Sequence, residues 1–203
     1  FSQFSRKRKP KEPCQRCGLS ATYCICSLIP NLRLRTRIVL VIHAKELKRT
    51  TNTGTLALEA LPNSQLKIRG NDLSPLDLSP LLTPEYETLL LYPTAHSLEL
   101  SPNFLKSMTK PIQLIVPDGN WRQASKVCTR HKELDLVPRV MIKSLNLAKH
   151  HLRAENSSYG MSTLEAIARA LGIIEHPQVE ASLMELYQAK LHSTLKSRGI
   201  SLA

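Results

Sequence analysis

The sequence predicts an α/β fold in which helices cover both faces of a mostly parallel β-sheet. Short apolar runs typical of buried strands occur at 37–42, 88–92 and 112–116. Segments with helical periodicity alternate with these runs along the chain. Parallel strands need long crossover connections, usually helices, so this alternation favours parallel pairing over hairpins.

Local signals support the individual elements. A helix is predicted at 162–171, because Ser162 and Glu165 form a capping-box pattern at its start. We expect Gly172 to end this helix. The other predicted elements are strands at 65–69 and 139–142 and helices at 55–61, 102–107, 121–131 and 179–195.

Length and composition exclude several classes of protein. The chain has 203 residues and 42% apolar residues, which fits one folded domain with a small appendage and excludes a wholly disordered chain. No apolar run approaches the roughly 20 residues that span a bilayer, so we expect no integral membrane protein. No secretory signal is visible, which predicts a cytoplasmic location. Because the chain begins with Phe1, we expect residues to be missing before it.

The strongly basic charge points to a polyanionic partner. The formal net charge is +12, and nucleic acid is the usual partner of such a chain, although an ordinary basic protein is the alternative. Residues 1–13 hold a net +4 and are predicted to form a flexible tail that contacts phosphates, or a solvated tail with no partner. The remaining +8 is expected to gather around the active-site mouth.

A cysteine-rich segment at 14–30 predicts a structural zinc site. In a reducing compartment four closely spaced thiolates can surround one tetrahedral zinc ion, which leaves no open position for catalysis. Reduced buried cysteines or a redox pair are the alternatives. Cys128 stands apart and is predicted to be an ordinary core side chain. The predicted zinc ligands are Cys14, Cys17, Cys24 and Cys26.

The most informative polar segment follows the strand at 112–116. Pro117 is expected to end that strand, and Asp118 would then lie at the mouth of the sheet, where ligands bind in α/β folds. Gly119 allows close approach, and Trp121 offers a flat face to a base. The alternative is a turn in which Asp118 caps the next helix and Trp121 packs in the core. The sequence contains no P-loop, GxGxxG or GxSxG pattern.

Taken together, the motifs resemble the DTW-domain family of tRNA-uridine aminocarboxypropyltransferases over about residues 14–172. Each motif is weak alone, but all occur in family order. Asn120 departs from the family pattern, which has Thr at this position. The matching residues are the four cysteines, Glu46, Asn52-Thr53-Gly54, Asp118-Gly119-Asn120-Trp121, Arg153 and Ser162-Thr163-Leu164-Glu165-Ala166.

The resemblance implies a SPOUT-like α/β catalytic domain at 31–203 with a C-terminal trefoil knot. It also implies S-adenosylmethionine as the donor and tRNA as the partner, with no obligatory protein partner evident. The family transfers the 3-amino-3-carboxypropyl group to N3 of a uridine and releases methylthioadenosine.

The positions of residues at strand ends and helix starts, set against the reaction that the resemblance implies, suggest roles for individual residues. Asp118 is the expected general base, or alternatively a hydrogen-bond partner of the cofactor's amino group, and Trp121 is the second expected catalytic-site residue. The expected cofactor-binding residues are Thr94, Gly119, Trp121, Ser162 and Thr163. The expected substrate-binding residues are Glu46, Asn52 and Arg153.

Two other functions are compatible with the sequence. One is a zinc-containing RNA-binding protein without catalytic activity. The other is a SPOUT-like RNA methyltransferase, which would use the same cofactor but transfer its methyl group.

Overall fold

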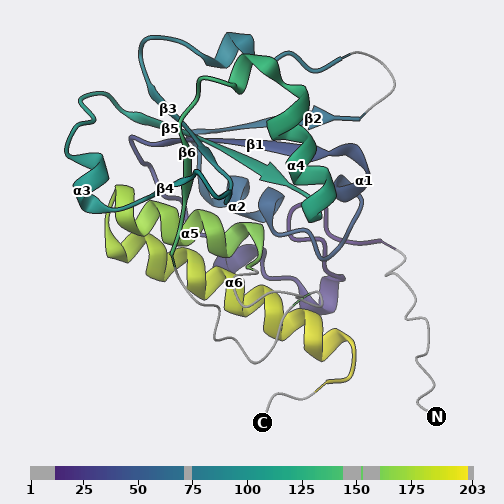
Figure 1. The fold of residues 1–203 in the computed structure, drawn as a ribbon. Helices are drawn as coiled ribbons and strands as arrows, with labels where there is room; N and C mark the ends of the chain where they lie inside the picture. The colour runs from purple at the N-terminus through teal and green to yellow at the C-terminus, as the bar shows by residue number, and fades with distance from the viewer. Residues whose placement is uncertain (1–11, 71–74, 144–151, 153–160, 201–203) are drawn as a thin grey trace.

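The computed structural model describes residues 12–70, 75–143, 152 and 161–200. Within them a six-stranded sheet has the order β2-β1-β5-β3-β6-β4, and every neighbouring pair is parallel (Figure 1). This confirms the predicted parallel α/β architecture. The strands are β1 (Arg37–His43), β2 (Ser64–Arg69), β3 (Glu87–Leu91), β4 (Leu98–Glu99), β5 (Ile112–Asp118) and β6 (Arg139–Met141).

Helices cover both faces of the sheet. The two long C-terminal helices lie against each other and, with α2, cover one face, while α4 covers the other (Figure 1). The helices are α1 (Ala44–Leu47), α2 (Gly54–Ala60), α3 (Pro102–Leu105), α4 (Trp121–Arg130), α5 (Thr163–Ile174) and α6 (Pro177–Ser197). Short 3-10 turns occur at Ala21–Tyr23, Cys26–Leu28, Ser79–Leu81 and Lys132–Leu134.

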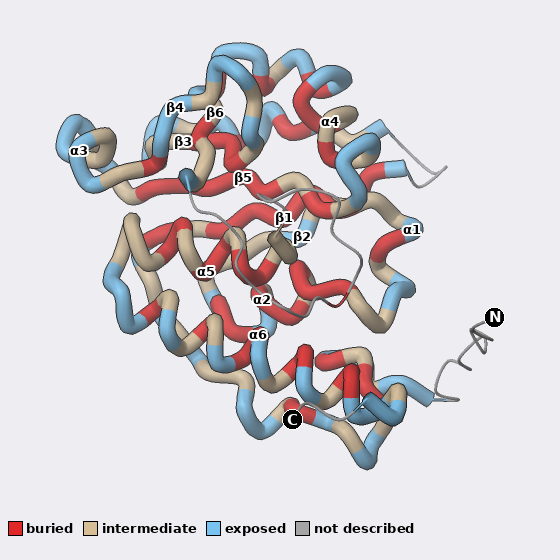
Figure 2. The backbone as a smooth tube through the Cα atoms, turned by 60° about the horizontal axis from the view of Figure 1, so that its bottom comes forward, coloured by how far each residue is buried: buried red, intermediate tan, exposed pale blue. Residues whose placement is uncertain are grey.

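Strand β1 shows why the sheet needs a helical layer on each side. Ile38, Leu40 and Ile42 belong to the core beneath α2, α5 and α6, whereas Val39 and Val41 belong to the core beneath α4. Side chains alternate between the two faces of a strand, so an unbroken apolar run needs two apolar partners. The buried residues lie accordingly along the central strands and the facing sides of the helices (Figure 2).

The cysteine-rich segment packs onto the main core. Cys17, Leu19 and Ile25 are buried and belong to the same apolar cluster as the inner side of α6. The fully buried Lys190 of α6 donates a hydrogen bond from Nζ to the Cys17 carbonyl oxygen. Burial lowers the pKa of Lys190 to about 8. The predicted boundary between this segment and the domain at 31–203 stays a prediction.

Most predicted element ends lie within two residues of the observed ones, and two of the differences have a structural reason. Strand β5 does not end at Pro117 but continues to Asp118. The pairing with β3 ends at Ile115, while the pairing with β1 continues to Asp118, so the proline lacks a neighbour on the β3 side. Because Pro has no N–H, it is tolerated where one neighbour has already ended.

The expectation that Gly172 ends α5 was wrong. The helix continues to Ile174, and Gly172 lies within it, where it permits close contact with α6. A β-carbon added at Gly172 would lie 2.7 Å from Cβ of Glu180 and would also meet the Glu180 carboxylate. Close helix packing therefore outweighs the low helix propensity of glycine here.

The predicted trefoil knot depends on the connection between β6 and α5. Residues 144–151 and 153–160 of this connection lie outside the described residues, and so does the predicted substrate residue Arg153. The knot therefore stays a prediction. Among the described residues, no helix combines the length and apolar character that a membrane crossing requires.

We expect Gly172→Ala to lower the free energy of unfolding by about 1–3 kcal/mol, because the added methyl group overpacks the α5–α6 contact. Urea unfolding followed by circular dichroism would measure this change. The double variant Gly172→Ala/Glu180→Ala should recover only part of the loss, since it removes the carboxylate but keeps the close Cβ. An unchanged or raised stability in Gly172→Ala would contradict this account.

Candidate active site

The carboxylate of Asp118 lies at the centre of the candidate site. Asp118 ends the central strand β5 and is 6% exposed. Its Oδ2 accepts a hydrogen bond from Nδ2 of Asn52 at 2.7 Å, and its Oδ1 accepts one from Oγ1 of Thr163 at 2.5 Å. One buried acid thus brings together three segments that the sequence singled out separately.

The segment Asn52-Thr53-Gly54 is shaped to approach this acid. Oδ1 of Asn52 accepts from the Thr55 backbone N–H at 2.9 Å and from the Thr55 hydroxyl at 3.0 Å, which directs the amide nitrogen toward Asp118. A β-carbon on Gly54 would lie 2.8 Å from Oδ2 of Asp118. Glycine is therefore required where the start of α2 passes the carboxylate.

The start of α5 approaches Asp118 from the other side. Ser162 and Glu165 form the predicted capping box: Oγ of Ser162 accepts from the Glu165 N–H at 3.3 Å, and the Glu165 carboxylate accepts from the Ser162 N–H at 2.9 Å. The cap fixes the first turn, so Thr163 presents its hydroxyl to Asp118. The Leu164 N–H donates to Oγ1 of Thr53 at 3.3 Å, which joins the starts of α5 and α2 directly.

The turn after Asp118 leads into α4. Gly119 has φ +146°, and a β-carbon there would lie 2.7 Å from Oε1 of Gln123. Asn120 caps α4, since its Oδ1 accepts from the Gln123 N–H at 2.9 Å and its own N–H donates back to Oε1 of Gln123 at 2.8 Å. The family pattern has Thr at position 120. Asn and Thr are both good N-cap residues, so Asn120 can cap α4 in place of the family's Thr.

Trp121 lies on the surface beside the end of β3. Its side chain is 53% exposed, and its ring packs edge-on against Tyr92 with the centroids 6.2 Å apart. Asp118 does not cap α4, and Trp121 is not a core residue, so the structure does not support the alternative reading of this segment as a simple turn.

The other predicted site residues have varied settings. Thr94 lies in the turn after β3, and its Oγ1 is 2.8 Å from Oγ of Ser97. Glu46 is 1% exposed on α1, with Oε1 3.2 Å from Nε of the half-exposed Arg49. Glu46 thus holds a surface arginine, and its direct contact with substrate stays a prediction.

The four cysteines near the N-terminus form a second, separate site. Their Sγ atoms lie within 4.8 Å of one another, with Cys14 and Cys26 at 3.4 Å and Cys17 and Cys24 at 3.7 Å. Hydrogen bonds from the backbone at Cys17 and Arg16 lower the pKa of Cys14 to about 6, whereas burial raises the pKa of Cys26 to about 12. This set of ligands has the chemistry and spacing to hold a metal ion.

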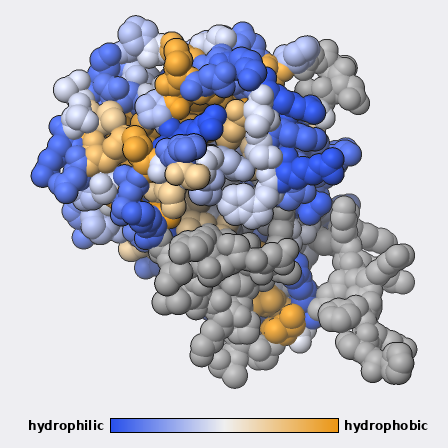
Figure 3. All heavy atoms as spheres, in the orientation of Figure 1, coloured by the Kyte–Doolittle hydropathy of each residue, from blue (hydrophilic) through white to orange (hydrophobic). Residues whose placement is uncertain are grey.

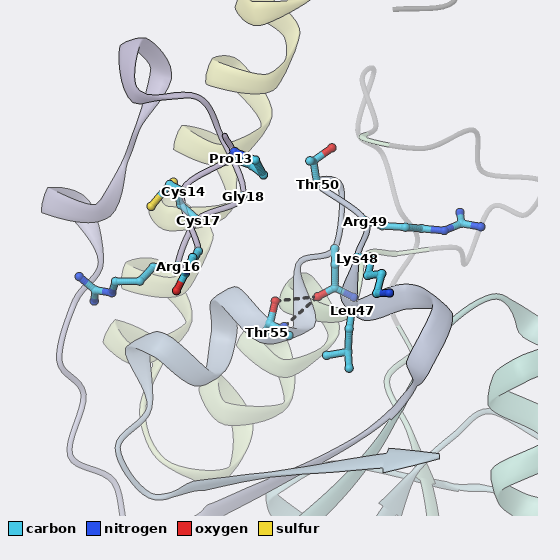
Figure 4. Close-up of a pocket in the computed structure, with 12 residues that line it drawn as sticks. Pro13, Cys14, Arg16, Cys17, Gly18, Leu47, Lys48, Arg49, Thr50 and Thr55 are labelled. Atoms are coloured by element: carbon cyan, nitrogen blue, oxygen red, sulfur yellow. Dashed lines mark hydrogen bonds between the residues drawn. The ribbon is translucent and has the colours of Figure 1, made fainter. Parts of the chain in front are cut away.

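A hollow of about 200 Å³ separates the cysteine segment from the loop before α2 (Figure 4). It is lined by the turn around Cys14 and Cys17 and by the stretch from Leu47 to Thr50. Asn52 also lines it, and the same residue reaches Asp118 through its side chain. The predicted cofactor residues at the ends of β3 and β5 do not line this hollow.

Some contributing residues were not among the predicted site residues. Thr53 and Gly54 belong to the family motif but not to the predicted site residues, yet Thr53 accepts a hydrogen bond from α5 and Gly54 leaves room for the Asp118 carboxylate. Tyr92, the last residue of the strand predicted at 88–92, packs against the Trp121 ring. The small-residue pattern of the motif was a signal for Gly54, whereas nothing local in the sequence indicates the contact of Tyr92.

These features define a parallel α/β protein with a buried acid at the carboxyl edge of its sheet and a separate four-cysteine cluster. The DTW domain matches residues 11–195, and the chain belongs to this family.

Relatives of the chain are similar over most of its length. It is 27% identical over 189 residues to the tRNA-uridine aminocarboxypropyltransferase 2 of Macaca fascicularis, which covers 90% of this chain and 63% of the relative. It is 26% identical over 182 residues to the protein of the same name from Drosophila melanogaster, covering 86% of this chain and 71% of that protein. The chain thus spans under two thirds of the length of the macaque relative.

One solved structure is similar in shape. It is the SAM-dependent rRNA:acp-transferase Tsr3 from Vulcanisaeta distributa, with a TM-score of 0.47 and 18% identity, covering 80% of this chain and 84% of that one.

Removing the Thr163 hydroxyl should weaken the junction at Asp118. We expect Thr163→Val to lower the free energy of unfolding by about 1.5–3 kcal/mol, because hydrogen bonds to charged groups contribute about that much. Thr163→Ser keeps the hydroxyl and serves as the matched control, which should stay within about 1 kcal/mol of the wild type. Equal stability of the Val and Ser variants in urea unfolding would show that this hydrogen bond contributes nothing.

Proposed function

We propose that this chain transfers the 3-amino-3-carboxypropyl group of S-adenosylmethionine to N3 of a uridine in tRNA, with release of methylthioadenosine. Its family and the names of its relatives support this activity. The observation that carries the proposal is the convergence of three family motifs on the buried Asp118 carboxylate. The SPOUT-like knot and the cytoplasmic location belong to the same proposal.

The residues near Asp118 fit a ligand with both a flat heterocycle and a positively charged group. Trp121 exposes an aromatic face suited to a purine, and Asp118 is an acid suited to an ammonium group. The capped start of α5 at Ser162 has N–H groups that favour a carboxylate. When bound, S-adenosylmethionine supplies a sulfonium that makes its attached carbons electrophilic, so the protein selects among them by position.

Asp118 is proposed to take the proton from uridine N3, which must lose it before it can attack. Two donors already orient this carboxylate, so its position is fixed before substrate arrives. Burial at a strand end is a setting in which a carboxylate can act as a general base. The alternative role, a hydrogen bond to the cofactor's amino group, uses the same carboxylate and predicts weaker cofactor binding when Asp118 is changed.

The activity can be tested with tRNA and two preparations of S-adenosylmethionine, labelled on the methyl or on the carboxypropyl group. We expect only the carboxypropyl label to enter tRNA, and nucleoside mass spectrometry should find the modified uridine. Methyl label in tRNA would favour an RNA methyltransferase. Absence of both labels would favour an RNA-binding protein without catalytic activity.

Asp118→Asn should abolish carboxypropyl transfer and leave cofactor affinity largely unchanged, as measured by calorimetry. The expected loss is at least 100-fold in turnover, the range typical of a removed general base. Asn52→Asp offers a comparison in which Asp118 is kept but one of its donors is replaced by a second acid. Near-normal turnover in Asp118→Asn would rule out the general-base role, and a parallel loss of cofactor affinity would favour the alternative role.

We further propose that the four-cysteine cluster holds a structural zinc ion. Sulfur atoms around tetrahedral zinc lie about 3.8 Å apart at a Zn–S distance of about 2.3 Å, close to the separations in this cluster. Such a site requires reduced thiols, in keeping with the proposed cytoplasmic location. The ammonium of Lys190, next to the Cys17 carbonyl, is placed to offset the negative charge of four thiolates.

The purified chain should contain about one zinc ion, measured by mass spectrometry of the metal. Cys24→Ala should contain less than one equivalent, because the site loses one of its four thiolate ligands and the remaining three bind zinc more weakly. Cys128→Ala is the matched control, since Cys128 lies in the core beneath α4 and should keep the metal. Removing zinc with a chelator should lower the melting temperature of the wild type, because binding energy contributes to folding. Full zinc content in Cys24→Ala would contradict the assignment.

A further inference from the structure

The exposed side of α4 carries a row of positive charge. Arg122, Lys126 and Arg130 are spaced four residues apart, which places them above one another on one side of the helix. No acidic residue occurs in α4. The opposite side of the helix is buried and contains Ala124, Val127 and Cys128.

Folding does not account for this row. Like charges at i and i+4 destabilise a helix by a few tenths of a kcal/mol per pair. Within the described parts of the chain, neither Arg122, Lys126 nor Arg130 has an ion pair with a carboxylate. Other surface lysines do have one, as Lys143 does with Glu99 at 2.9 Å.

Arg69 adds a fourth positive charge at the carboxyl end of β2. It is only 8% exposed, and its Nη1 donates to the Gln123 carbonyl oxygen of α4 at 3.3 Å. Its buried Nε has no hydrogen-bond partner among the described residues. A buried guanidinium with an unused donor, held against a row of cations, is suited to an anionic ligand. We call Arg69, Arg122, Lys126 and Arg130 the basic ridge.

The charges of the ridge act on one another and on a neighbouring histidine. The pKa of Lys126 is lowered, chiefly by Arg130 and further by burial, Arg122 and Arg69. The pKa of His43, at the end of β1, is lowered by burial and then by Arg69 and nearby lysines. The parts of these shifts that come from neighbouring cations indicate a positive potential, which a bound polyanion would relieve.

The ridge begins beside the candidate active site. Arg122 follows Asp118 by four residues, and the exposed Trp121 lies between them in the sequence. From Arg122 to Arg130 the helix rises about 12 Å, enough to contact more than one phosphate of a nucleic acid. Hydrophilic side chains cover the part of the surface that carries α4 and α1 (Figure 3).

We propose that the basic ridge binds the phosphate backbone of the RNA substrate and leads one nucleotide toward Trp121 and Asp118. The identity of the RNA as tRNA rests on the proposed function, whereas the binding of RNA phosphates by this surface does not. No covalent step is involved, and the surface reads charge and shape rather than base sequence.

The test uses the full chain and fluorescently labelled, unfractionated tRNA in polarisation titrations from 50 to 300 mM salt. The double variant Lys126→Gln/Arg130→Gln removes two ridge charges. The matched control Lys106→Gln/Lys110→Gln removes two exposed lysines before β5, at the opposite edge of the sheet from Asp118. Melting temperature and S-adenosylmethionine binding are measured on all variants to confirm folding.

The ridge variant should bind tRNA about 25- to 60-fold more weakly at 0.1 M salt. Binding of the variant neutralises two fewer phosphates and therefore releases fewer counterions. Its plot of log affinity against log salt should become shallower by about 1.5–2. The control variant should change the tRNA affinity and the salt slope by only a small fraction of the changes in the ridge variant. Unchanged binding in the ridge variant, or an equal loss in the control, would overturn the proposal.

Failure of the ridge and failure of the proposed function have different signatures. A wild type that binds tRNA through the ridge but transfers no carboxypropyl label would refute the function and support the ridge. A wild type that transfers label, with a ridge variant of unaltered tRNA affinity, would refute the ridge alone.

Discussion

The site depends on the hydrogen bonding of one buried carboxylate. Asp118 ends the central strand, and its two oxygens accept from Asn52 and Thr163, which lie far away in the sequence. A buried acid without donors costs several kcal/mol, so these partners must be in place whenever the chain is folded. The starts of α2 and α5 are therefore held against the end of β5 by the acid that they solvate.

This constraint explains the small residues around the acid. Gly54 is glycine because a β-carbon would meet the carboxylate, and Thr53 links α2 to α5 by accepting from Leu164. Gly119 turns the chain at φ +146°, so that α4 can begin at once under the Asn120 cap. The same few atoms thus position the acid, the exposed Trp121 and the first residues of the basic ridge.

Most helices and strands could be predicted, because their signals lie within a few residues of each other in the sequence. Apolar runs and capping pairs such as Ser162 with Glu165 indicate elements directly, and all the long ones were confirmed. The predicted helix end at Gly172 was wrong because this glycine is needed for a close contact with Glu180 of α6. The helix propensity of the local sequence carries no information about a contact with another helix. The hydrogen bonds of Asp118 and the packing of Tyr92 on Trp121 were unpredictable for the same reason, since they join segments distant in sequence.

The basic ridge lies where it can offset the repulsion between the Asp118 carboxylate and a polyanion. A buried carboxylate repels an approaching polyanion, and water at the mouth screens this only in part. Positive charge that begins at Arg122, the second residue of α4, and continues along the helix offsets this repulsion where the RNA backbone would lie. The acid itself is buried between Asn52 and Thr163, and within the described parts of the chain none of the three α4 cations forms an ion pair with it. In the proposed function, separating the two charges along one strand–turn–helix unit lets a single element both attract an anionic substrate and present an acid to it.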